Sequence, residues 1–138
     1  MNLFQKNIIP CNLTLRQALT ELNNLPITLK VLICDYNRLA KLDDLPLALE
    51  VLYCRDNALT FLDNLPTALK VLLCSDNQLT SLDNLPTALE VLYCEGNNIS
   101  NTIQISLRFP NLAIIRGCMY MNEEHLNGFL DNLYQKYI

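Results

Sequence analysis

The sequence repeats itself at one short, fixed interval, and this repeat limits the possible folds more than any other feature. Leu-Pro pairs recur at this interval, beginning at Leu25, Leu45, Leu65 and Leu85. A cysteine column and an asparagine column keep the same spacing, at Cys34, Cys54, Cys74 and Cys94 and at Asn37, Asn57, Asn77 and Asn97. A unit this short cannot bury its own apolar side, so the copies must stack and share one continuous core.

Each unit contains a V-L-x-C segment that predicts a short strand. In residues 31–34, alternation places Leu32 and Cys34 inside and Val31 and Ile33 outside. Equivalent strands would lie parallel, about 4.8 Å apart. The asparagine that follows can satisfy backbone groups of the neighbouring turn. A coil this short, with an extended Pro-containing segment, leaves no room for a helix on the convex side.

The unit L-P-x-x-L-x-x-L-x-C-x-x-N-x-L-x-x-L-x-x resembles the leucine-rich repeat, in the short form seen in bacterial effectors and some large-virus proteins. The resemblance covers residues 22–99 in strict register. It implies a leucine-rich-repeat solenoid with a short parallel concave β-sheet, a non-helical convex side and helical caps. It also implies a host-directed, protein-binding function. Such effectors often carry a separate ubiquitin-ligase domain, which nothing in these 138 residues resembles, so that activity is not expected here.

We expect one leucine-rich-repeat domain over residues 1–138, with four regular repeats in residues 25–101. Residues 1–24 form either an N-terminal capping helix or a degenerate first coil. Thr14 and Gln17 fit a capping box, which favours the helix.

The C-terminal end departs from the regular register. Residues 102–121 predict an irregular last coil with a strand within residues 112–119, in which Ile115 takes the place of Leu92. Residues 122–138 predict a helix that covers this last coil, because apolar side chains recur at helical spacing, at Leu126, Phe129, Leu130, Leu133 and Tyr137.

Charge and hydropathy restrict the classes of partner. The net charge of −4 disfavours nucleic-acid binding, which needs a cationic surface. No apolar run approaches the length of a transmembrane helix, so no membrane insertion is expected. Without a visible cleavable signal peptide, the chain is expected in a cytoplasm or delivered into a host cytosol, where a reducing compartment keeps its thiols reduced.

The cysteines invite a chemical interpretation, but a structural one is stronger. A linear column of thiols does not converge on a metal, and parallel side chains pair poorly as disulfides, so core packing is preferred. Cys118 and His125 could serve a hydrolase or transferase, yet no orienting third group is evident. We therefore expect no enzyme activity, no catalytic residue, no metal and no cofactor.

The outward positions of the strands and the turns that follow them form the candidate site. We predict that a partner protein binds on this concave face, through Tyr53, Tyr93, Ile33, Leu73, Arg55, Glu95, Asp35, Tyr36, Asp56 and Asp76. An apolar and aromatic strip flanked by charges is typical of protein interfaces. The same residue types also favour strands without any ligand, so a scaffold-only role stays open. A further alternative is a self-assembling homodimer with no separate ligand.

Overall fold

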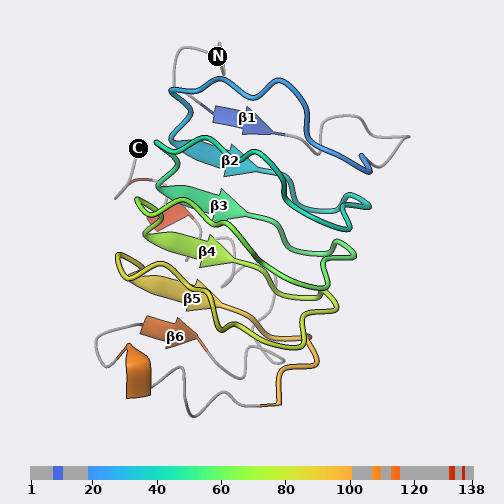
Figure 1. Ribbon diagram of the computed structural model, residues 1–138, viewed down its shortest axis with the longest axis vertical. Coiled ribbons are helices and arrows are strands. Elements are labelled where there is room, and N and C mark those ends of the chain that lie inside the picture. Colours follow the sequence, from blue (N-terminus) through green and yellow to red (C-terminus); the bar gives the residue numbers. More distant parts are fainter. Residues whose placement is uncertain are drawn as a thin grey trace.

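Among the residues that the structure describes, six short strands stack in chain order (Figure 1). The computed structural model describes residues 8–10, 19–100, 107–109, 113–115, 131–132 and 135. The strands are β1 (Ile8–Pro10), β2 (Val31–Ile33), β3 (Val51–Tyr53), β4 (Val71–Leu73), β5 (Val91–Tyr93) and β6 (Ala113–Ile115). All five neighbouring pairs are parallel, so each coil contributes one strand to a single sheet.

The register of the central strands confirms the predicted coil length. Leu52 pairs with Leu32 on one side and with Leu72 on the other. Backbone hydrogen bonds between neighbouring coils continue beyond the strand ends: the Cys54 amide donates to the Leu73 carbonyl at 2.8 Å. Between the strands, residues 19–100 contain turns and bends but no helix, as predicted for the convex side.

The interior of the coils is a stack of leucine and cysteine columns. Leu32, Leu52, Leu72 and Leu92 are all 0% exposed. They belong to one core cluster that also contains the thiols of Cys34, Cys54 and Cys74. The predicted inward positions are therefore confirmed, and the core is a shared product of neighbouring repeats.

The asparagine column joins each coil to the preceding one, as its position predicted. Asn77 Oδ1 accepts a hydrogen bond from the Leu59 amide at 3.0 Å. Its Nδ2 donates to the carbonyls of Cys54, Cys74 and Ser75 at 2.9, 3.1 and 3.1 Å. One buried side chain thus satisfies backbone groups of two successive turns, where no strand partner is available.

The N-terminal segment contributes a strand, which fits the degenerate first coil. Ile8 pairs with Val31, so this coil is slightly longer than the next one, in which Val31 pairs with Val51. Residues 19–22, the end of the favoured helix, have no helical structure, and the earlier part of that prediction lies outside the described residues. Two of the apolar residues that suggested a helix, Leu19 and Leu22, instead pack against the core of the coils.

At the C-terminal end the predicted register is wrong by one position. Leu92 pairs with Ile114, not with Ile115. The run Leu112-Ala113-Ile114-Ile115 offers an apolar residue in either register, so the pattern could not distinguish them. The rest of residues 102–121, apart from 107–109, lies outside the described residues.

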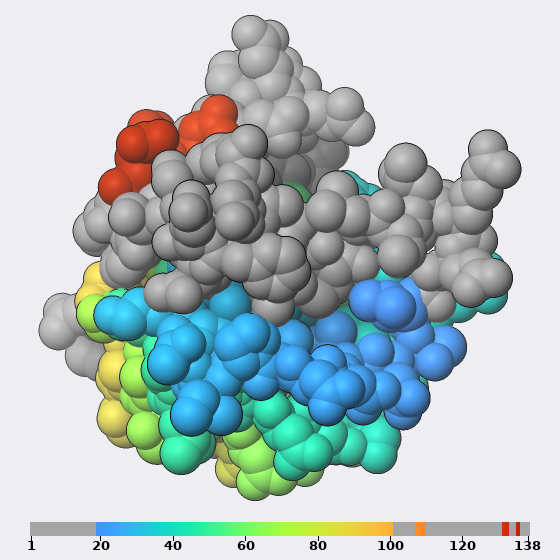
Figure 2. All heavy atoms as spheres, turned by 90° about the horizontal axis from the view of Figure 1, so that it is seen from above, coloured from blue at the N-terminus to red at the C-terminus, as the bar shows by residue number. Residues whose placement is uncertain are grey.

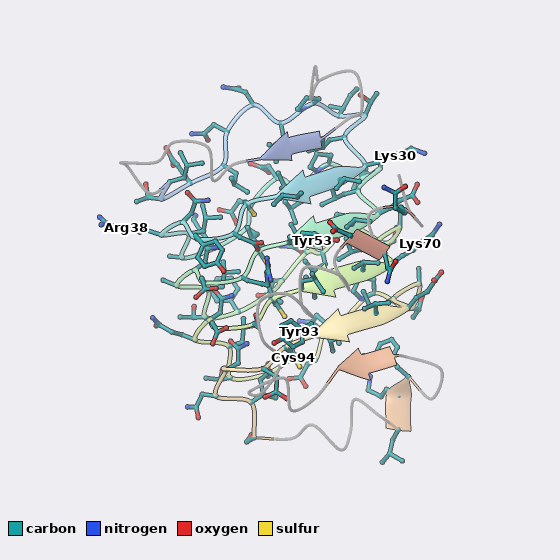
Figure 3. The ribbon with its side chains drawn as sticks, turned by 180° about the vertical axis from the view of Figure 1, so that it is seen from behind. Lys30, Arg38, Tyr53, Lys70, Tyr93 and Cys94 are labelled. Carbon is teal, nitrogen blue, oxygen red and sulfur yellow. The ribbon has the colours of Figure 1, made fainter. Side chains whose placement is uncertain are left out.

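Residues 131, 132 and 135 are helical, in the segment expected to cover the last coil. Residues 131–132 instead lie over the sheet beside β3 and β4 (Figure 3). The other residues of the predicted cap are not described. In the part of the chain that the structure covers, no helix is long and apolar enough to cross a membrane.

Candidate partner-binding surface

A left-handed residue follows each central strand and sets the carboxyl edge of the sheet. Tyr36, Asp56, Asp76 and Gly96 occupy this position with φ of 58°, 52°, 53° and 67°. Aspartate tolerates this region better than most residues, and glycine adopts it without strain. The Tyr36 amide donates to the Arg55 carbonyl at 2.9 Å, and the Asp76 amide to the Glu95 carbonyl at 2.8 Å. The backbone of this row is therefore held at successive coils.

Next to this row, Asp35 and Arg55 form a buried ion pair across two coils. Arg55 Nε and Nη2 donate to Asp35 Oδ2 at 3.1 and 2.6 Å, and the Arg55 amide donates to Asp35 Oδ1 at 2.7 Å. The two side chains are only 10% and 3% exposed. Burial is the largest single influence on Arg55 and opposes its charge, but the hydrogen bonds to Asp35 and the charges of Asp35, Tyr36 and Asp56 together outweigh burial and raise its pKa. The two side chains satisfy each other's hydrogen-bonding groups and are buried, so they offer little accessible surface to a partner.

The apolar column of the predicted site is not accessible. Tyr53, Leu73 and Tyr93 are 5%, 0% and 7% exposed, and Ile33 is half-buried. Tyr53, Leu73 and Tyr93 therefore do not present the open face expected of them, and neither do the buried Asp35 and Arg55. That these residues bind a partner stays a prediction. Alternation does place them opposite the core cluster, and Tyr53, Leu73 and Tyr93 are nevertheless buried there.

Asp131 is a described residue from the far end of the chain that lies on this side of the sheet. The helical residues 131–132 lie outside the stack of coils, on the sheet side (Figures 2 and 3). Burial, chiefly, raises the pKa of Tyr53 to about 12, and the negative charges of Asp35 and Asp131 contribute. Asp131 therefore approaches the middle of the predicted site.

What remains accessible is a ridge along the carboxyl edge, formed by Tyr36, Asp56, Asp76 and Glu95 and here called the carboxyl-edge ridge. Tyr36 is 63% exposed, Asp76 is exposed, and Asp56 and Glu95 are half-buried. Partial burial and the neighbouring charge of Asp76 raise the pKa of Asp56. The structure thus brings four of the ten predicted residues to one accessible, acidic surface.

The opposite edge of the sheet carries charges of alternating sign on successive coils. Lys30 and Lys70 lie there, away from Arg38 on the carboxyl side (Figure 3). Glu50 lies between them, with Nζ to carboxylate distances of 3.3 and 3.2 Å. The hydrogen bond from Lys70 is the main reason why the pKa of Glu50 is lowered. The two edges therefore differ in charge: the carboxyl-edge ridge is acidic, whereas the opposite edge pairs its lysines with Glu50.

The described thiols behave as core residues. Cys34, Cys54 and Cys74 are fully buried, and burial raises the pKa of Cys54 and Cys74 well above the usual value. A buried thiol with a raised pKa is a poor nucleophile. Among the described residues, no group of three or more His, Cys, Asp or Glu is placed to hold a metal ion. Cys118 and His125 lie outside the described residues.

Two features of the site were missed by sequence reasoning. The Asp35–Arg55 pair had a signal, since opposite charges stand one repeat apart and therefore face each other in a stacked solenoid. The left-handed row also had one, because Asp and Gly recur at Asp56, Asp76 and Gly96 directly before the asparagines. Gly96 fits closely, since a Cβ there would collide with the Asp76 carboxylate.

Comparison with known proteins supports the repeat architecture. No model of a known protein family matches the chain, and no curated protein matches its sequence. The leucine-rich-repeat domain of a Shigella effector aligns with 72% of this chain at a TM-score of 0.64 and 32% identity. YopM from Yersinia enterocolitica WA-314 aligns with 71% at a TM-score of 0.51 and 30% identity. The alignments span 44% and 26% of those two chains.

Proposed function

Because the chain is a leucine-rich-repeat protein, we propose that it is a non-catalytic, effector-type module that binds a partner protein on the sheet side of its solenoid. The likeness to the Shigella effector domain supports the class of function. The carboxyl-edge ridge supports the place of first contact, because it is the accessible part of the predicted site.

The ridge can recognise a partner through rigid display. The left-handed backbone and the asparagine ladder hold Tyr36, Asp56 and Asp76 at fixed steps, so little conformational entropy is lost on binding. Tyrosine is a frequent anchor of protein interfaces, and 63% exposure leaves Tyr36 available for contact. The carboxylates around it favour a partner with a cationic surface and disfavour nucleic acid.

The experiment is site-specific photo-crosslinking in lysate of a plausible host cell. A photo-reactive phenylalanine analogue replaces Tyr36 in one variant and Phe61 in the control, since Phe61 is 49% exposed and lies outside the strands, between β3 and β4 in the chain. We expect one partner to crosslink at position 36 and not at position 61. Charge reversal by Asp76→Lys should weaken this crosslink at least about tenfold. Equal crosslinking at both positions, or none at position 36, would contradict the proposed surface.

Self-association is the second candidate, favoured by a separate apolar patch. Ile27 and Leu47 occupy the same position in adjacent coils and are 85% and 83% exposed. Adjacent exposed aliphatic side chains are a common element of protein interfaces. Light scattering at several concentrations should then show a dimer, and the Leu47→Asp substitution should dissociate it into monomers. A monomer at all concentrations would leave the heterologous partner as the function.

The state of the thiols bears on where the protein works. Cys34, Cys54, Cys74 and Cys94 are thiols rather than disulfides, and reduced thiols persist in reducing compartments. We therefore propose a cytosol as the place of action, either that of the producing cell or that of a host.

A further inference from the structure

Charges of alternating sign stand at the edge where the central strands begin, one residue before each strand. They are Lys30, Glu50, Lys70 and Glu90, here called the charge ladder. The Glu50 amide donates to the Lys30 carbonyl at 2.9 Å, and the Lys70 amide donates to the Glu50 carbonyl at 2.8 Å. The Glu90 amide continues the series with a hydrogen bond of 2.7 Å to the Lys70 carbonyl. The backbone therefore holds successive charges one strand spacing apart, about 4.8 Å.

The charge ladder stays accessible after its internal pairing. Glu50 contacts the ammonium groups of Lys30 and Lys70 at 3.3 and 3.2 Å, yet the lysine side chains remain 59% and 39% exposed. Glu90 is exposed as well. The buried ion pair at the carboxyl edge, by contrast, is only 3% and 10% exposed. Because an ammonium group has three donors and a carboxylate accepts several hydrogen bonds, the charge ladder can also pair with charges of another chain.

Exposed aliphatic side chains flank the first two charges of the ladder. Ile27 and Leu47 stand three positions before these charges and are 85% and 83% exposed. A tight turn, closed at residues 46–49 by a backbone hydrogen bond of 3.0 Å, connects the two columns. In the next two coils the aliphatic column continues with the exposed Thr67 and Thr87. Charges and apolar area therefore lie beside each other, as they do in protein interfaces.

We propose that this edge is a two-fold interface on which a second copy of the chain docks antiparallel. This inference rests on the self-association given above as the second candidate, and it supplies the geometry. Reversing the order of the charge ladder inverts every sign, so Lys30 faces the partner's Glu90 and Glu50 faces the partner's Lys70. Two-fold symmetry repeats both pairs. A parallel arrangement in register would instead bring like charges together, which is unfavourable.

The two columns have different roles in this dimer. Ile27 and Leu47 supply most of the affinity, because burial of exposed aliphatic side chains is favourable. Exposed ion pairs contribute little free energy, but they fix the register of the two chains. An interface along four coils is small, so the dimer should dissociate on dilution. The carboxyl-edge ridge lies at the other edge of the sheet and stays free for a different partner.

Three charge exchanges test the antiparallel geometry, and each preserves composition and net charge. In the first exchange, Lys70→Glu with Glu90→Lys, the order from position 30 to position 90 becomes positive, negative, negative, positive. The second exchange, Lys30→Glu with Glu50→Lys, gives the inverse order. Both oppose like charges in the antiparallel dimer. The third exchange, Glu50→Lys with Lys70→Glu, keeps every intermolecular pair complementary, although it sets like charges on neighbouring coils of one chain.

Sedimentation of the full chains at low salt, over a concentration series, measures the dissociation constant of the dimer. We expect the parent chain and the third exchange to dimerise alike, and the first and second exchanges at least about tenfold more weakly. An equimolar mixture of the first and second exchanges should recover the dimer, because their charges are complementary when antiparallel. The control, Lys41→Asp with Asp43→Lys, reverses an exposed ion pair outside the ladder and should change nothing.

The outcomes separate the geometry from the self-association itself. A dimer that Leu47→Asp dissociates, but that the first two exchanges leave intact or their mixture does not restore, would overturn the antiparallel geometry alone. Loss of the dimer in the third exchange as well would overturn it too, because the ladder would then act within one chain. A parent chain that is monomeric at all concentrations would overturn the self-association together with this inference.

Circular dichroism checks that each exchange folds. Should one fail to fold, salt titration of the parent chain replaces it: the affinity of the dimer should fall as ionic strength rises, and a salt-independent dimer would overturn the proposal. Crosslinking at Tyr36 does not involve this edge. Its absence would therefore refute the proposed contact surface and leave the dimer unaffected.

Discussion

Loss of a central asparagine should show how strongly the coils depend on their connecting hydrogen bonds. Asn77 is 8% exposed and makes four hydrogen bonds to backbone groups. In Asn77→Ala the carbonyl of Cys54 keeps a bond from Asn57, and that of Cys74 keeps one from Asn97. The Leu59 amide loses the acceptor described for it, in a residue that is 0% exposed.

The loss in the free energy of unfolding follows from which of these hydrogen bonds Asn77→Ala removes. A buried donor left without a partner costs about 1–3 kcal/mol, and weakening of the three carbonyl contacts adds to it. We therefore expect Asn77→Ala to reduce the free energy of unfolding by about 2–4 kcal/mol. Asn77→Asp keeps an acceptor for Leu59 but turns a carboxylate toward three carbonyls, so it should also destabilise, with partial recovery in acid.

Urea unfolding monitored by circular dichroism measures the change, and hydrogen exchange at the Leu59 amide localises it. Asn84→Ala is the control, because Asn84 is exposed and bonds only to the Asp63 side chain among its described contacts. The control should change stability by less than about 0.5 kcal/mol. If Asn77→Ala costs no more than the control, or Leu59 exchange is unchanged, the asparagine ladder does not hold the coils together.

Three further predictions concern the core, a buried tyrosine and the thiols. Leu72→Ala truncates a fully buried side chain and should reduce the free energy of unfolding in urea by about 2–5 kcal/mol. The control Phe61→Ala changes an exposed residue and should reduce it by less than about 0.5 kcal/mol. Equal losses would contradict the interior position of Leu72. Burial raises the pKa of Tyr53 to about 12, so its stabilising effect is complete below pH 10 and is lost as the pH rises toward 12. Tyr53→Phe should therefore flatten the alkaline stability profile by about 2–3 kcal/mol, and an unchanged profile would show that the hydroxyl is not buried. In the native protein iodoacetamide should modify half-buried Cys94 and spare Cys54 until urea is added, whereas equal modification would contradict the buried thiol column.

The sequence was sufficient for the regular coils because each constraint occurs four times. A leucine ladder in phase with cysteine and asparagine columns has one packing solution, and Leu72 and Asn77 lie where the pattern placed them. Periodicity was weaker at the ends, where single copies replace the repeat. The first coil begins at Ile8 and the last pairs through Ile114, and neither interval matches that of the regular repeats.

The candidate site was predicted only in part, for a physical reason. Alternation specifies which face of the sheet Tyr53 and Leu73 occupy, but not whether another segment lies against that face. A residue far along the chain, Asp131, approaches the middle of the strip, and the repeat pattern contains no information about it. The ridge was predictable because Asp56 and Asp76 belong to the repeat itself.

Methyl NOE measurements on the leucine ladder test the central claim of coil stacking most directly. We expect cross-peaks from the Leu52 methyls to those of Leu32 and Leu72, because the three are paired in register and 0% exposed. A soluble paramagnetic probe should leave these methyl signals unbroadened. Missing inter-coil cross-peaks, or strong broadening of the Leu52 methyls, would contradict the stacked coils.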